Sequence, residues 1–142
     1  MNNPMYDASI PVLKQMLTAL AGVLDKTQAH AESKKIDAAV LLNARLAPDM
    51  FPLVRQVQIA VDFAKGISSR LAGIEVPSWP DDANAGFQDL QALIARVVAH
   101  LDGLEPSQFV DAQQRQIVLR AGTPKERSLQ GNAYLLHYGL PQ

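Results

Sequence analysis

The sequence predicts an all-α fold: a four-helix bundle with a small β-hairpin before the last helix, which is cut short. Three long segments carry apolar residues at the three- and four-residue spacing of an amphipathic helix. Proline and glycine stand where these segments would begin and end. The chain of 142 residues is long enough for one hydrophobic core, so we expect a single domain over residues 1–142.

The first helix is expected over residues 9–35. Asp7 or Ser9 can cap its N-terminus, and Pro11 would then fall in the first turn, where a missing N–H costs nothing. The apolar stripe of this helix consists of Leu13, Leu17, Leu20, Leu24 and Ala31. Such a stripe is typical of a helix that packs one face against a bundle.

A short helix is expected over residues 37–46, with Asp37 as its N-cap. Two prolines that bracket the sequence DMF separate it from a second long helix. Asp49 is the expected N-cap of that helix, which should run to about Ala72 and be closed by Gly73.

The next segment, residues 73–86, is expected to be a loop, since it contains two prolines, two aspartates and the only tryptophan. A third helix should follow over residues 84–103. Its apolar positions are Phe87, Leu90, Ile94, Val97, Leu101 and Leu104. At about 3.3 Å per residue, the loop can also cross the bundle, so the direction of this helix stays open.

Residues 115–130 combine a short β-branched run, a Gly-Thr-Pro turn and a polar arm, a pattern that predicts a small exposed hairpin. The closing sequence NAYLLHYGLPQ begins a further helix and then stops. Its tyrosines and leucines are too apolar for a free tail. Either this stub plugs the bundle, a neighbouring chain completes the bundle, or the fourth helix continues beyond residue 142.

A helical wheel of the second long helix, at about 100° per residue, raises the question of a buried amide. One narrow stripe is polar and is expected to face solvent: Arg55, Gln58, Asp62, Lys65 and Ser69. Gln56 lies opposite, on the side expected to be buried. A buried amide that lacks a hydrogen bond costs about 1–3 kcal/mol. Gln56 is therefore expected either to bond a backbone carbonyl or buried water, or to line a small polar pocket.

Four residues gather at one end of the bundle if the helices alternate in direction: His30, Asp49, Gln56 and His137. Two imidazoles and a carboxylate can hold a divalent metal such as zinc or nickel, with an open position for water. No histidine has the spacing that places two ligands on one helical face, so each can equally be a boundary residue. We expect a ligand pocket of these four residues and Tyr134, with His137 and Asp49 as metal contacts where a metal binds.

Composition excludes several functions. The net charge of −1 and the scattered basic residues disfavour nucleic acid as a partner. No apolar run approaches the roughly 20 residues of a membrane span, and the N-terminus does not resemble a signal peptide. Without cysteine, the chain has no disulfide and no cysteine nucleophile. We therefore expect a cytoplasmic protein without a membrane partner.

Four segments carry a resemblance: YDASIPVLKQML, NARLAPDMFPLVRQVQIAVDFAKG, RLAGIEVP and GNAYLLHYGLP. In this order they resemble a bacterial family of domains of unknown function, grouped with the DinB/YfiT-like metalloenzymes. The resemblance covers nearly the whole chain and implies a DinB-like four-helix bundle, commonly a homodimer. Metal-binding relatives use one histidine on the second helix and two on the fourth. Residues 51–72 contain no histidine, so Gln56 or Gln58 would stand there, and only His137 matches the fourth-helix pair.

The expected function is small-molecule binding at one end of the bundle, with or without a divalent metal. A hydrolytic or transfer reaction is left open. The alternative is a non-catalytic module for dimerisation or for ligand binding without metal. A homodimer is expected because an incomplete fourth helix leaves an apolar groove that a second chain would cover.

Overall fold

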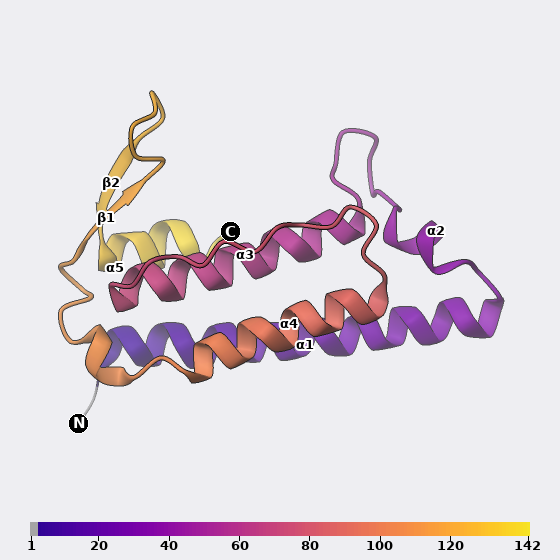
Figure 1. Cartoon of the computed structure of the whole chain (residues 1–142), viewed down its shortest axis with the longest axis horizontal. Coiled ribbons are helices and arrows are strands. Elements are labelled where there is room, and N and C mark those ends of the chain that lie inside the picture. Colours follow the sequence, from indigo (N-terminus) through magenta and orange to yellow (C-terminus); the bar gives the residue numbers. More distant parts are fainter. Residues whose placement is uncertain (1–2) are drawn as a thin grey trace.

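The computed structural model describes residues 3–142 and confirms the predicted four-helix architecture with a hairpin near the C-terminus (Figure 1). The elements are α1 (Pro4–Lys34), α2 (Ala38–Leu42), α3 (Leu53–Ala72), α4 (Phe87–Asp102), a 3₁₀ turn η1 (Pro106–Phe109), β1 (Gln116–Leu119), β2 (Arg127–Gln130), α5 (Gly131–Ala133) and a π-helix η2 (Tyr134–Gly139). Three long helices thus form the body, and the short pair α5 and η2 takes the fourth position.

The loop after α3 crosses the bundle instead of turning sharply. Figure 1 shows that α3 runs back along α1, and that residues 74–86 then return along the whole length of α3. As a result α4 is parallel to α3 and antiparallel to α1. The last segment begins at the C-terminal end of α3 and runs back along it. This direction decides which residues can meet, because the start of α3 and the start of η2 lie at opposite ends.

The core is built from the apolar stripes that the sequence predicts. In α1, Leu13, Leu17 and Leu24 are buried. All six predicted apolar positions of the third long helix are buried. Burial of this kind contributes about 25 cal/mol for each Å² of apolar surface removed from water, so these two stripes are a main source of the stability of the fold. None of the helices described has the length and hydrophobicity needed to cross a membrane.

The helix starts differ from the predictions. α1 begins earlier, because the side chain of Asn3 accepts a hydrogen bond from the Tyr6 N–H (3.2 Å) and Pro4 takes the first position. Ser9 is not a cap; it is buried and donates to the Met5 carbonyl (2.6 Å). With this earlier start, Pro11 lies inside the helix and not in its first turn.

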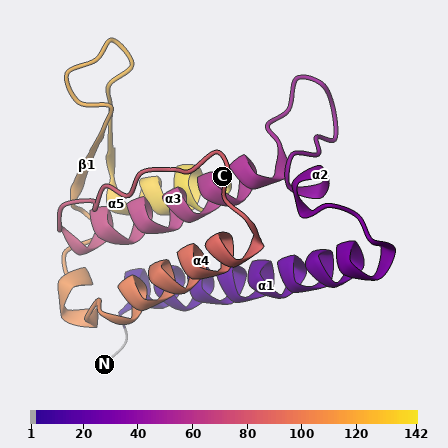
Figure 2. The same cartoon turned by 45° about the vertical axis from the view of Figure 1, so that its right-hand side comes forward.

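Asp49 does not cap α3. The helix starts three residues later than expected, after Pro52, whose extended backbone provides the N-cap. Asp49 itself is exposed in the loop that projects between α2 and α3 (Figure 2). The short helix keeps Asp37 as its N-cap but ends at Leu42, not at residue 46.

The C-terminal end of α3 is as predicted, with Gly73 in the left-handed region (φ 75°) that closes a helix at little cost for glycine. α4 starts at Phe87 and not at residue 84, because the Asp89 carboxylate accepts a hydrogen bond from the Gly86 N–H (2.8 Å) and fixes the start there.

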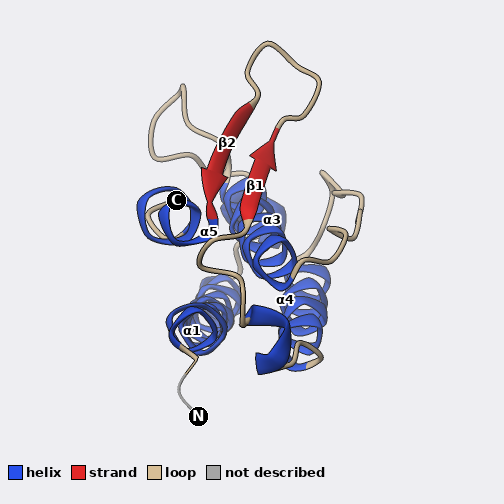
Figure 3. Cartoon of the chain, turned by 90° about the vertical axis from the view of Figure 1, so that its left-hand side faces the viewer, coloured by secondary structure: helices blue, strands red, loops and turns tan. Residues whose placement is uncertain are grey.

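The hairpin and the last segment lie together at the end of the bundle where α3 ends (Figure 3). β1 and β2 pair antiparallel, with Gln116 opposite Gln130 and Leu119 opposite Arg127. Tyr134 and Leu135 of the last segment are fully buried against the bundle, as the first of the three alternatives predicts.

Candidate functional site

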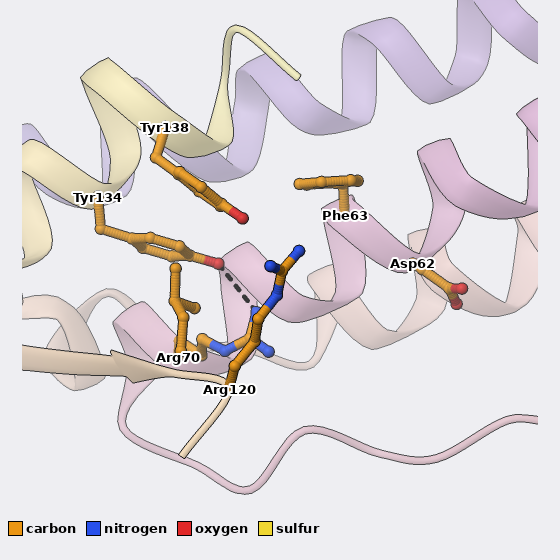
Figure 4. A pocket seen from close by; sticks show the side chains of 7 residues that line it. Asp62, Phe63, Arg70, Arg120, Tyr134 and Tyr138 are labelled. Atoms are coloured by element: carbon orange, nitrogen blue, oxygen red, sulfur yellow. Dashed lines mark hydrogen bonds between the residues drawn. The ribbon is translucent and has the colours of Figure 1, made fainter. Parts of the chain in front are cut away.

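A cavity of about 190 Å³ lies between α3, the end of β1 and η2 (Figure 4). Six polar or aromatic side chains line it: Asp62, Phe63, Arg70, Arg120, Tyr134 and Tyr138. The helices α3 and η2 meet here because the last segment packs back onto α3. The cavity is therefore formed by segments that lie far apart in the sequence.

Arg70 is held at the cavity by α3 and by a tyrosine of η2. Its Nη1 donates a hydrogen bond to the Tyr134 hydroxyl oxygen (3.0 Å), and its guanidinium carbon lies 5.9 Å from the centre of the same ring. Gly66, one turn earlier, leaves room for this arrangement, since a Cβ there would lie 2.6 Å from Nη1. Burial raises the pKa of Tyr134, and Arg70 offsets part of that rise. The Tyr134 hydroxyl is therefore protonated at neutral pH.

Aromatic rings form one wall of the cavity. The rings of Tyr134 and Tyr138 are stacked, with centres 5.8 Å apart and planes 23° apart. Phe63 of α3 extends the wall, and the centre of its ring lies 6.5 Å from the centre of the Tyr138 ring. Tyr134 and Tyr138 both belong to the π-helix, a rare conformation that is frequent at functional sites. Gly139 allows η2 to approach α3, because a Cβ there would lie 2.8 Å from Ile67.

Arg120 reaches the cavity from the hairpin. It follows β1 directly and has a positive φ of 54°, a region that is costly for a residue with a side chain. Figure 4 shows its guanidinium extending toward Tyr138 and Phe63. Strained backbone of this kind is often found where a side chain is held for binding.

The charges around the cavity are unbalanced. In the part of the chain that the structure describes, neither Arg70 nor Arg120 forms an ion pair. The only carboxylate of the lining, Asp62, is already 3.4 Å from the ammonium of Lys65. The cavity thus offers two guanidinium groups with unused N–H donors beside an aromatic wall.

The structure does not assemble the pocket that the sequence predicts. His30, Asp49 and His137 are exposed, and only Tyr134 of the predicted set lines the cavity. Asp49 precedes α3, whereas η2 packs on the C-terminal half of that helix, so Asp49 and His137 lie at opposite ends. For each residue taken singly, contact with a ligand stays a prediction.

The prediction that Gln56 is buried is wrong. Its side chain is exposed and donates to the Phe51 carbonyl (2.9 Å). Three residues of the predicted polar stripe are buried instead: Gln58 is 3% exposed, Lys65 5% and Ser69 0%. The wheel groups these residues correctly, but the returning loop of residues 74–86 covers them, which periodicity within one helix cannot reveal.

The residues present do not fit the divalent metal that the resemblance implies. Within residues 3–142, no group of three or more histidine, aspartate or glutamate side chains could hold a metal ion. Between described residues, only one histidine has a polar side-chain partner: the Nε2 of His100 lies 2.9 Å from the Ser69 hydroxyl. Neither residue adjoins a carboxylate that would complete a ligand set.

Four residues that line the cavity are not predicted from the sequence: Phe63, Arg70, Arg120 and Tyr138. Two spacings of four residues in the sequence are signals that could have found part of the site. Gly66 and Arg70 share a face of α3, and Tyr134 and Tyr138 lie one helical turn apart. Nothing local in the sequence points to Arg120, because its position depends on how the hairpin packs.

Comparison with known proteins agrees with the fold. Residues 5–142 match the family model described as a domain of unknown function (DUF1993). The crystal structure of a DinB family member protein from Shewanella denitrificans is similar over 96% of this chain and 76% of that chain, with 37% sequence identity and a TM-score of 0.86. No protein with a curated description matches the chain. The family match extends from α1 to the C-terminal residue, and the chain therefore belongs to the DUF1993 family, with a fold like that of a DinB family protein.

Proposed function

We propose that this protein binds a small organic anion with a flat apolar body in the cavity between α3, β1 and η2. The observation that supports the proposal is the convergence of two unpaired arginines, Arg70 and Arg120, on an aromatic wall. Guanidinium groups bind carboxylate and phosphate oxygens in a bidentate manner, and two such groups that line one cavity can orient an anion.

The cavity also favours an apolar body on the ligand. The stacked rings of Tyr134 and Tyr138, together with Phe63, offer a flat surface on which an aromatic or planar group can pack. At about 190 Å³ the cavity is smaller than the roughly 300–1,000 Å³ of drug-sized sites. A ligand the size of an aromatic carboxylic acid is therefore the best match.

The test compares each anion with its neutral counterpart. A panel of aromatic carboxylates and the corresponding amides is added to the purified protein, and thermal unfolding is followed. We expect the carboxylates to raise the melting temperature and the amides not to do so, because only the carboxylates engage the arginines. Equal shifts for both members of each pair would contradict the proposal.

Arg120→Gln identifies the site. Arg120 is exposed, so its replacement should leave the fold intact while removing one of the two cationic contacts. We expect anion affinity to fall by roughly tenfold or more, as for the loss of a charge-assisted hydrogen bond. Arg127→Gln is the matched control, since Arg127 is an exposed arginine of the same hairpin that does not line the cavity.

We also propose that the chain forms a homodimer through α1. Met16 is 65% exposed and Val23 58% exposed on this helix, although both are apolar. A stripe of this kind is normally covered by another chain, and the same stripe on a second copy makes a symmetric pair. Sedimentation should give twice the chain mass for the wild type and the chain mass for Met16→Glu. A monomeric wild type would overturn this proposal.

A further inference from the structure

We propose that Trp79 is a pH-sensitive latch: when His100 takes up a proton, the segment of residues 74–80 leaves its position against α3 and α4. This inference does not depend on the ligand proposed above. It rests on the way in which the returning loop is attached to the buried polar stripe of α3.

The loop is held to the bundle by side chains. Among the described residues, no backbone group of residues 75–81 hydrogen-bonds to another backbone group. Segments that lack such bonds open at low free-energy cost. The attachment at the far end consists of an ion pair between Arg55 and Asp81 and a hydrogen bond from Gln58 to the Asp82 carbonyl (2.8 Å). In the middle, Trp79 contacts side chains of both α3 and α4.

Trp79 lies between two cations and a histidine. The ammonium of Lys65 on α3 is 4.9 Å from the centre of its ring, and the guanidinium carbon of Arg96 on α4 is 4.1 Å away. The ring of His100, also on α4, meets Trp79 edge to face with centres 6.1 Å apart. Cation–π attraction from both helices therefore holds the loop against α3 and α4.

Within residues 3–142, no carboxylate forms an ion pair with His100. Its Nε2 is 2.9 Å from the hydroxyl of Ser69, which is fully buried, and its ring packs on the same Trp79 ring as the cations Lys65 and Arg96. Asp62, on α3, pairs with Lys65 on the side of the cavity. Burial, and secondly the charge of Lys65, lowers the pKa of His100.

The sign of the pH effect follows from this arrangement. Because the latched state lowers the pKa of His100 below its ordinary value of 6.5, that state is favoured above pH 6.5 and weakens as the pH falls through the lowered pKa. Protonation adds a third positive charge beside Lys65 and Arg96. Release of Trp79 lets water reach all three groups and removes this repulsion.

The experiment uses Trp79 as its own reporter, since it is the only tryptophan of the chain. Emission maximum and quenching by acrylamide are measured from about pH 8 to about pH 5. We expect the emission maximum to move to longer wavelength and the acrylamide quenching constant to rise roughly twofold as the segment opens. Because a protonated histidine by itself shortens the Trp lifetime, the lifetime is measured at each pH and the quenching is compared as the bimolecular rate constant, from which the lifetime has been divided out.

Three variants make the test specific. In His100→Gln both readouts should keep their high-pH values over the whole range. His30→Gln and His137→Gln are the matched controls, because both histidines are exposed, and they should behave as the wild type. A flat wild-type profile, or the same transition in His100→Gln, would overturn the latch.

A second measurement separates opening of the latch from general acid unfolding. The ¹H–¹⁵N heteronuclear NOE should fall for the amides of residues 74–79 as the segment becomes mobile, whereas hydrogen exchange in α3 and α4, corrected for the intrinsic effect of pH, should stay unchanged. The helical circular dichroism signal should also be constant. Hydrogen exchange that also rises in α3 and α4, or a parallel loss of the helical signal, would show that the whole molecule unfolds and would refute a local latch.

Discussion

At the scale of single residues, glycines decide how closely the last segment can pack. A Cβ at Gly131 would overlap the carbonyl oxygen of Ala112, a backbone atom that cannot move aside. We expect Gly131→Ala to lower the free energy of unfolding by about 2–4 kcal/mol, measured by urea unfolding. Gly22→Ala is the control with the opposite sign. Gly22 lies in α1 with no heavy atom near its Cβ position, so alanine should stabilise by about 0.5–1 kcal/mol.

The hydroxyl of Tyr134 provides a second residue-scale prediction. Tyr134→Phe removes the acceptor of the Arg70 hydrogen bond in a buried position, and we expect a loss of about 0.5–1.5 kcal/mol in unfolding free energy. Tyr138→Phe is the matched change in the same π-helix, with no side-chain hydrogen bond between described residues to lose. A larger loss for Tyr138→Phe than for Tyr134→Phe would contradict this assignment.

At the scale of elements, Arg115 ties the start of the hairpin to the end of α3. It donates to the Leu71 carbonyl and packs over Gly73, where the carbonyl groups of α3 carry partial negative charge. We expect Arg115→Met to cost about 1–3 kcal/mol, because the methionine keeps the packing but loses the charged donor. Urea unfolding of this variant beside Arg127→Gln measures the difference, and equal stability of the two would exclude this role.

The element scale also shows what the sequence can predict. The stripes of α1 and α4 are read correctly, since each helix has a single apolar face toward the core. The residues of the polar stripe on α3 are grouped correctly, but the sequence predicts that they face solvent. In the structure Trp79 and Asp81 contact this stripe, and they come from a loop whose path no periodicity describes. Because the path of this loop is not in the pattern, the helical wheel also predicts wrongly that Gln56 is buried.

At the scale of the whole molecule, direction and topology control the site. The loop that crosses the bundle puts the start of η2 at the far end of α3, so the predicted cluster around Asp49 and His137 cannot form, and a cavity with Arg70 and Arg120 forms instead. The family resemblance predicted the fold correctly. It could not locate this cavity, which depends on the packing of a hairpin and a π-helix against one face of α3.

Anion binding at this cavity is the central claim, and the arginine side chains can report it directly. The measurement is a ¹H–¹⁵N NMR spectrum of the arginine Nε–H groups during titration with an aromatic carboxylate. We predict that the signals of Arg70 and Arg120 shift and saturate together, because both guanidinium groups bind the same anion, while that of Arg127 stays in place. Unchanged Arg70 and Arg120 signals at high carboxylate concentration, or an equal shift at Arg127, would contradict the claim.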